Sequence, residues 1–161
     1  MVKFGLQIKA NLENVTNLQP DGEDFRWYLK LKCLNCGEEP DHFQYLTLLE
    51  SAPLKGGRGS ASLVVKCRLC GRENSIDIIK ESIASYTAEE SDANKYKTIT
   101  SFDCRGMEPT AFSPRAGFSC KGANSVTVFE VDLKENEWVD YDEKAKESVG
   151  IYEVESKFIK L

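Results

Sequence analysis

The chain has 161 residues and a formal net charge of −5, and 41% of its residues are hydrophobic. A chain of this length folds as one domain or as two small units that share a core, and its apolar content excludes a disordered chain. The acidic balance disfavours broad electrostatic binding to nucleic acid or to an anionic membrane surface. No uninterrupted apolar run of about 18 residues occurs, so no membrane-spanning helix is expected.

The first residues, MVKFGLQIKANLENV, alternate apolar and polar side chains. They lack the apolar segment and the small-residue cleavage site of a secretory signal. We therefore expect a cytoplasmic protein, with the nucleus as a second location. In that reducing setting, six cysteines are expected to be metal ligands, redox groups or buried thiols and not a disulfide framework.

Apolar and polar residues alternate along most of the chain, which predicts β-strands. In chain order these runs lie at 3–12, 25–33, 43–50, 60–67, 74–83, 96–104, 124–133 and 150–161. The second run places its apolar side chains on one face, at Phe25, Trp27, Leu29 and Leu31. Because one face of such a strand is buried, these four residues are predicted to enter the core.

Clusters of turn-forming residues at 19–22, 55–59 and 121–124 separate these runs. Two short helices are expected, one at 87–96 with Thr87 as its N-cap and one at 140–148. The chain is therefore predicted to be all-β, an antiparallel sandwich or barrel-like structure.

A faint internal repeat suggests how the strands are organised. Leu18-Gln19-Pro20 and Met107-Glu108-Pro109 are each followed by a loop and by an aromatic-containing strand that reaches a cysteine. This predicts two similar β units in one compact structure, 1–94 and 95–161, of which only the first carries paired cysteines. The alternative is two unrelated strand–loop–strand segments.

The sequence Lys-Cys-x-x-Cys-Gly occurs at 32–37 and again at 66–71. At the end of a strand, Cys-x-x-Cys forms a tight turn, or knuckle, that presents two thiolates on one side, and the following glycine lets the chain turn. Tetrahedral zinc takes four such ligands. The two motifs therefore predict one Zn²⁺ per chain, bound by Cys33, Cys36, Cys67 and Cys70. Because both knuckles follow alternating strands, we expect those two strands to lie side by side.

A catalytic role for these cysteines is a weaker interpretation than structural zinc binding. A thioredoxin-like motif accompanies a βαβ unit, whereas both motifs here follow β-strands. Four thiolate ligands leave no open position on zinc for water. His42, the single histidine, is expected at the surface, and Cys104 and Cys120 are expected to be buried small apolar residues. No catalytic residue and no other cofactor-binding residue is predicted, so the chain is not expected to be an enzyme.

The stretch 54–72 is basic, has no acidic residue and surrounds the second cysteine pair. It is interpreted as solvated surface that also offsets the negative charge of a four-thiolate zinc site. A nucleic-acid contact, as in zinc ribbons, is a weaker alternative. Residues 55–59 lack the pattern of a phosphate-binding loop, and a flexible loop is expected there.

Four segments, GEDFRWYLKLKCLNCGE, LKGGRGSASLVVKCRLCGRENSI, FDCRGMEP and WVDYDEKAKESVGIYEV, resemble the eukaryotic CXXC-motif-containing zinc-binding protein family. The resemblance extends over essentially the whole chain. It implies zinc ligation by the same four cysteines, an all-β fold of two similar halves and a small soluble cytosolic protein without established catalytic activity. It also implies metal-handling partners, a copper chaperone for superoxide dismutase among them. No role for Cys120 follows from it.

The leading hypothesis is a non-catalytic, monomeric zinc-binding protein that acts as a protein–protein interaction or metal-homeostasis adaptor. Its four-thiolate zinc site is structural. The first alternative is metal handling, in which labile thiolates exchange zinc or copper. A nucleic-acid-binding module that uses 54–72 and a thiol oxidoreductase are weaker alternatives.

Overall fold

The computed structural model describes residues 2–54 and 59–161, and nearly all of its regular structure is β. The strands are β1 (Val2–Glu13), β2 (Val15–Pro20), β3 (Trp27–Cys33), β4 (Gln44–Leu46), β5 (Ala52–Pro53), β6 (Ser60–Ala61), β7 (Leu63–Lys66), β8 (Glu73–Ile79), β9 (Lys97–Arg105), β10 (Met107–Ser113), β11 (Phe118–Gly122), β12 (Val128–Val131), β13 (Trp138–Asp142) and β14 (Glu147–Lys160). A 3₁₀ turn, η1 (Lys80–Ser82), and one short helix, α1 (Ala88–Asp92), complete the elements. The prediction of an all-β antiparallel fold is confirmed.

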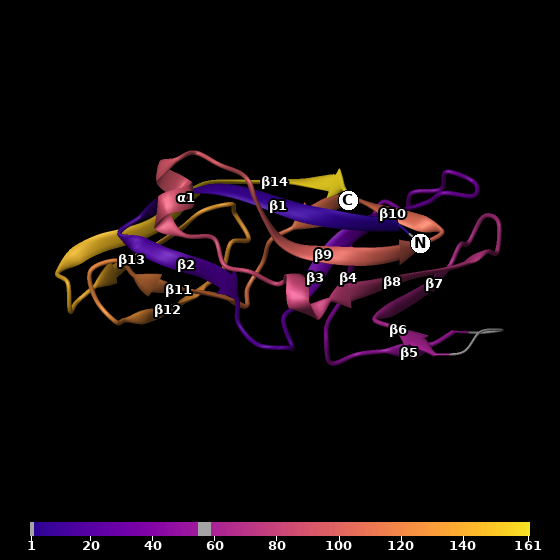
Figure 1. Cartoon of the computed structure of the whole chain (residues 1–161), viewed down its shortest axis with the longest axis horizontal. Helices are drawn as coiled ribbons and strands as arrows, with labels where there is room; N and C mark the ends of the chain where they lie inside the picture. Colours follow the sequence, from indigo (N-terminus) through magenta and orange to yellow (C-terminus); the bar gives the residue numbers. More distant parts are fainter. Residues whose placement is uncertain (1, 55–58) are drawn as a thin grey trace.

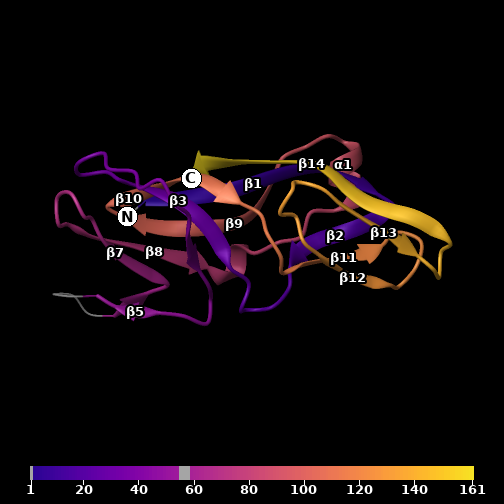
Figure 2. The same ribbon diagram turned by 180° about the vertical axis from the view of Figure 1, so that it is seen from behind.

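The largest sheet has the strand order β13-β14-β1-β9-β8-β7, and its neighbouring strands are antiparallel. Two three-stranded sheets, β10-β3-β4 and β12-β11-β2, and the β5-β6 hairpin complete the fold. Figures 1 and 2 show the molecule as elongated, with β2, β11, β12 and β13 at one end, β5 to β8 toward the other, and β3 and β4 nearer the middle. The long strands β1 and β14 connect the two ends.

The core is one cluster of buried apolar side chains to which every long strand contributes. Trp27 on β3 is 1% exposed, and its ring meets those of Phe25, Phe102 and Phe112. Phe25 also forms an edge-to-face contact with Phe118 on β11, with ring centroids 4.8 Å apart. The alternating face predicted for β3 is therefore confirmed, because Leu29 and Trp27 are both fully enclosed.

The predicted division at residue 94 stays a prediction. The sheets join strands from both sides of that position: β1 lies between β14 and β9, β3 pairs with β10, and β2 pairs with β11. The two ranges thus share their sheets and their core.

The helix expected at 140–148 is wrong, because β13, a turn and β14 form a hairpin there. The Asp142 side chain accepts hydrogen bonds from the backbone amides of Lys144 and Ala145, at 3.0 and 3.1 Å. Such bonds favour a turn over a helix, and the positive φ of Lys146, +55°, completes the reversal.

The helix expected at 87–96 forms over a shorter length. Thr87 is its N-cap: its side chain accepts from the amide of Glu90, while the Glu90 carboxylate accepts from the amide of Thr87. This reciprocal capping box explains why the helix begins there. It ends at Asp92, and Asn94 follows with a positive φ of +55°.

Some strand bounds also differ from those predicted. Within the run predicted at 43–50, only β4 is a β-strand. The run predicted at 74–83 contains most of β8 followed by the 3₁₀ turn η1. The short strands β10 and β11 gave no clear alternating signal, and β10 contains Pro109, which cannot donate a ladder hydrogen bond. The loop expected at 55–59 lies, apart from Gly59, outside the described residues. No helix among the residues described is long and apolar enough to cross a membrane.

Candidate metal centre

The first knuckle starts where β3 ends. Cys33 is the last residue of β3, and its backbone carbonyl accepts a hydrogen bond from the amide of Gly37, at 2.8 Å. The amide of Cys33 donates to the carbonyl of Glu38, at 2.9 Å. Gly37 has a φ of +81°, which explains why glycine occupies this position. These bonds close the turn and place Cys33 and Cys36 on the same side of it.

The second knuckle has the same pattern of backbone hydrogen bonds as the first. Cys67 follows β7 directly, and its carbonyl accepts from the amide of Gly71, at 2.9 Å. Its own amide donates to the carbonyl of Arg72, at 2.8 Å, and Gly71 has a φ of +76°. The repeated sequence motif therefore produces the same local backbone twice.

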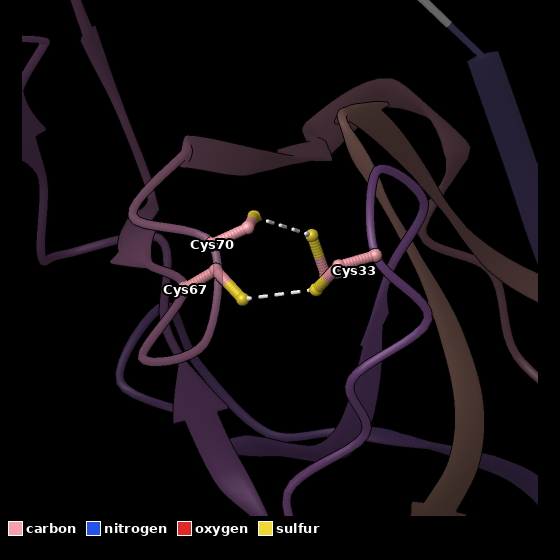
Figure 3. Close-up of side chains that lie close together, drawn as sticks. Cys33, Cys67 and Cys70 are labelled. Carbon is pink, nitrogen blue, oxygen red and sulfur yellow. Dashed lines mark hydrogen bonds between the residues drawn. The ribbon is translucent and has the colours of Figure 1, made fainter.

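The two knuckles face each other and bring the four sulfur atoms together (Figure 3). The Sγ atoms of Cys33 and Cys70 are 3.8 Å apart, and those of Cys36 and Cys67 are 3.5 Å apart. All four lie within 4.8 Å of one another. A zinc ion with Zn–S bonds of about 2.3 Å requires tetrahedral sulfur separations of about 3.8 Å. The cluster therefore has the size and the donor set for one Zn²⁺, held by the four predicted cysteines.

The strands that lead into the knuckles do not lie side by side, so this expectation was wrong. β3 pairs with β10 and β4 in a three-stranded sheet, whereas β7 is the edge strand of the six-stranded sheet and pairs with β8. The sulfur cluster thus bridges two sheets that share no ladder hydrogen bonds at this point. A metal bound there would cross-link them.

Two further residues support the first knuckle. The carbonyl of Gly106, between β9 and β10, accepts a hydrogen bond from the amide of Leu34, at 2.9 Å. The Cα of Gly106 lies against the side-chain amide of Asn74 on β8, where a Cβ would overlap Asn74 Oδ1. Asn74 is 3% exposed, and its Oδ1 has no hydrogen-bond partner. The backbone at Gly106 therefore fits closely between β8 and the first knuckle.

Asparagine side chains also modify the thiols. A side-chain hydrogen bond from Asn74 is the main reason that the pKa of the Cys33 thiol falls to about 6. The pKa of the Cys70 thiol is lowered as well, first by a side-chain hydrogen bond from Asn35 and then by the backbone of Arg72. Thiolate is the form that binds metal, so these hydrogen bonds favour ligation.

Cys36 differs from those two cysteines. The backbone at Glu38 lowers the pKa of its thiol, but desolvation and the three neighbouring sulfur atoms outweigh that effect and raise the pKa to about 12. Four thiols so close together cannot all carry a charge without a cation between them, because like charges at these separations repel strongly. A divalent metal ion removes that conflict.

The cluster is open on one side. Each knuckle contributes one buried cysteine, Cys33 or Cys67, and one exposed cysteine, Cys36 or Cys70. Each also carries an exposed leucine between its cysteines: Leu34 is 50% exposed and Leu69 is 68% exposed. The metal centre therefore lies at the surface and is flanked by two apolar side chains.

The other candidate residues lie apart from the cluster. His42 is exposed in a bend and does not belong to the group of possible metal ligands found among the described residues. Cys104 and Cys120 are each 2% exposed, and burial raises the pKa of both thiols to about 12. They are buried small apolar residues, as expected, and inert as nucleophiles.

Sequence reasoning missed Asn35, Asn74 and Gly106. Asn35 was visible as the polar residue inside the first motif. Asn74 and Gly106 carried no local signal, because their importance comes from contacts between strands far apart in the chain.

The fold and the site together define an all-β protein with a four-cysteine candidate metal site formed by two CXXC motifs. The family model for the eukaryotic CXXC motif containing zinc binding protein matches residues 5–159, and the chain belongs to this family. A Xenopus laevis protein of that name is 63% identical over 161 residues, and a Homo sapiens protein of the same name is 58% identical over 161 residues. Each alignment covers 99% of both chains.

Solved structures share the fold. The crystal structure of C1orf123 matches with a TM-score of 0.93 and 58% sequence identity, over 99% of each chain. A hypothetical protein from Plasmodium falciparum matches with a TM-score of 0.88 and 25% identity, over 99% of this chain and 100% of that chain. The same arrangement of sheets therefore occurs in a protein with much lower sequence identity.

Proposed function

We propose that this protein is a non-catalytic adaptor in which zinc has a structural role and the surface around the zinc binds a protein partner. The observation that carries the structural role is the origin of the ligands: Cys33 ends a strand of one sheet, and Cys67 follows a strand of another. A single zinc would fix these two sheets relative to each other. Zinc binding of this kind contributes directly to the free energy of folding.

The absence of catalysis is part of this proposal. A zinc with four thiolate ligands has no open position for water or substrate, which a catalytic zinc requires. The exposed His42 lies outside the cluster, so it does not supply a general base beside the metal. The name of the family also describes zinc binding alone.

The partner surface is inferred from the exposed leucines. The side chains of Leu34 and Leu69 extend from the two knuckles into solvent. A bound partner that covered these large apolar side chains would remove them from water, which favours the complex. Because each leucine belongs to a turn closed around the metal, removal of zinc would disturb both. We propose a monomer that binds its partner in the cytoplasm or nucleus, with a copper chaperone for superoxide dismutase, implied by the family resemblance, as the first partner to test.

A pull-down from cell extract tests the adaptor role. We would compare the wild type with a Leu34→Ser/Leu69→Ser double variant and with Cys67→Ser. The leucine variant is expected to keep its zinc and lose the partner, whereas Cys67→Ser loses both. The matched control is Val126→Ser, which changes a side chain that is 71% exposed and far along the chain from the knuckles. Equal capture by the wild type and by the leucine variant would contradict the proposed surface.

The second candidate is metal handling, and one observation favours it: Cys36 and Cys70 are exposed, so an incoming ligand can reach the metal. Thiolates also suit copper(I). Competition with a colorimetric zinc indicator separates the two roles. Transfer of zinc within seconds supports handling, and retention for hours supports a structural zinc.

A further inference from the structure

The thiols of the four-cysteine cluster form two close pairs, and each pair joins one knuckle to the other. The Sγ atoms of Cys36 and Cys67 are 3.5 Å apart, and those of Cys33 and Cys70 are 3.8 Å apart. These are the two dashed contacts in Figure 3. A disulfide bond has a length of about 2.05 Å, so the closer pair needs to approach by only about 1.5 Å to form one.

Each pair combines one thiol that solvent reaches with one that is buried. Cys36 and Cys70 are exposed, whereas Cys33 is 5% exposed and Cys67 is 7% exposed. A dissolved oxidant therefore meets the exposed cysteine of a pair directly, and the buried cysteine already lies beside it. An accessible cysteine next to a second cysteine that can resolve its oxidised form is the arrangement of redox-sensitive thiols.

A disulfide inside one knuckle is the alternative product of oxidation. The backbone hydrogen bonds at Gly37 and Gly71 close the two turns, and the closed turns direct their sulfur atoms at each other across the cluster (Figure 3). This geometry favours bonds between the knuckles. The two products also differ in their effect on the fold, because only a bond between the knuckles cross-links the sheet of β3 to the sheet of β7.

We propose that the cluster is an oxidative modification site: a hydroperoxide converts it into two disulfides between the knuckles, Cys36–Cys67 and Cys33–Cys70, and the zinc is released. The inference deepens the proposed structural role of zinc and rests on zinc binding by these four cysteines. In the oxidised protein, the disulfides replace the metal as the cross-link between the two sheets. The sheets therefore stay connected when zinc leaves.

The reaction takes two steps for each pair. With hydrogen peroxide, the thiolate of the exposed cysteine attacks one oxygen atom, so that an S–O bond forms, the O–O bond breaks and hydroxide leaves. The thiolate of the buried cysteine then attacks the sulfur of this sulfenic acid, so that the S–S bond forms and a second hydroxide leaves. The two thiolates lose two electrons, and the peroxide gains them. After both pairs have reacted, the sulfur atoms no longer carry the negative charge that binds Zn²⁺.

The test adds hydrogen peroxide in steps to the zinc-loaded full-length protein. A chelating indicator measures the released zinc, and peptide mapping by mass spectrometry identifies the disulfides after free thiols have been alkylated. We expect the two disulfides between the knuckles to form as zinc is released, and dithiothreitol with added zinc to restore the starting protein. Cys104 and Cys120 are the internal control, because both are 2% exposed and should remain free thiols.

A melting experiment and a variant test which cysteines pair. The oxidised, zinc-free protein is expected to melt at least about 5 °C above the reduced protein treated with a chelator, because only the oxidised protein keeps its sheets cross-linked. Cys36→Ser removes one exposed thiol from the cluster. Cys70 can then pair with Cys33 of the other knuckle or with Cys67 of its own, and we expect the bond to Cys33. If this variant does not fold, the disulfide map of the wild type decides alone.

Disulfides within the knuckles, disulfides between two chains, or sulfinic and sulfonic acids in place of disulfides would each overturn the proposal. Retention of zinc at peroxide concentrations that oxidise added glutathione completely would overturn it as well. All of these results leave the structural role of zinc intact. That role fails instead if the protein holds no zinc, or melts identically with and without it, and both are measured before any peroxide is added.

Discussion

The Cα of Gly106 lies directly against the side-chain amide of Asn74, and the carbonyl of Gly106 accepts the amide hydrogen of Leu34. One residue between β9 and β10 thus contacts both halves of the metal centre. Its φ of +77° is unfavourable for any residue with a side chain, and the contact leaves no room for one. Gly106 is therefore required by conformation and by packing at once.

Gly106→Ala is expected to lower the free energy of unfolding by more than about 2 kcal/mol, since backbone strain and overlap with Asn74 add together. Urea denaturation measures the change. Gly37→Ala is the matched control: its φ of +81° is similar, but nothing lies within 4 Å of the position that its Cβ would occupy. Equal losses in the two variants would show that the contact with Asn74 contributes nothing.

Removal of zinc is expected to destabilise the fold. Because the cluster joins two sheets, a strong chelator should release about one zinc per chain and lower the melting temperature by about 10 °C or more. Elemental analysis and calorimetry measure both quantities. Cys67→Ser should melt at the lower temperature without chelator and should not respond to it. A wild-type protein that melts identically with and without zinc would rule out the structural role.

Asp142 gives a prediction about acid stability. It is fully buried, and its carboxylate accepts hydrogen bonds from the hydroxyls of Ser125 and Thr127 and from two backbone amides. The bond from Ser125, followed by these other donors, lowers its pKa below the ordinary value of 3.8. A group with a depressed folded-state pKa stabilises the fold above its unfolded pKa, and this contribution is lost as the pH falls through the folded value.

Asp142→Asn is therefore expected to be less stable than the wild type at pH 6 and to lose part of this difference below about pH 4. Unfolding curves of both proteins across that range provide the test. Both retain the zinc site, so the acid-dependent loss of metal cancels in the difference. A difference in stability that is constant from pH 6 to pH 3 would contradict the assignment.

Trp27 is expected to be the most sensitive core position of β3. It is 1% exposed and meets three aromatic rings, so Trp27→Ala should cost about 3–5 kcal/mol of unfolding free energy. Tyr45→Ala is the control: Tyr45 pairs with Tyr28 but is 36% exposed, and its loss should cost about 1 kcal/mol or less. A smaller loss for Trp27→Ala than for Tyr45→Ala would contradict this account of the core.

The clustering of the four cysteines could be predicted from the sequence, because each knuckle is formed by a local motif. Each Cys-x-x-Cys-Gly motif closes its own turn, and both glycines have the positive φ that their position implied. The burial of Trp27 and Leu29 could be predicted for a similar reason, since the alternation of apolar and polar residues along β3 is a short-range pattern. The N-cap at Thr87 was predicted for the same reason.

What could not be predicted depends on pairing across long sequence distances. The sequence predicted that β3 and β7, the strands that lead into the two knuckles, lie side by side. Instead, β3 forms hydrogen bonds with β10 in a different sheet from β7. Residues 140–148 have a helix-forming composition, but β13 and β14 pair there and Asp142 closes the turn between them. Ser125 and Thr127, from another part of the chain, also donate to the Asp142 carboxylate. Asn74 gains its importance from Cys33 and Gly106, which no local pattern connects to it.

The strand order has a consequence for biosynthesis. β1 pairs with β9 and with β14, so a strand that is synthesised early pairs with strands that are synthesised much later. All four zinc-binding thiols emerge before β9, and Gly106, which anchors the first knuckle, emerges after them. The nascent chain therefore exposes its cysteines while their scaffold is still missing. Metal captured at that stage would be held by the two knuckles alone, before Gly106 and β10 support the first of them.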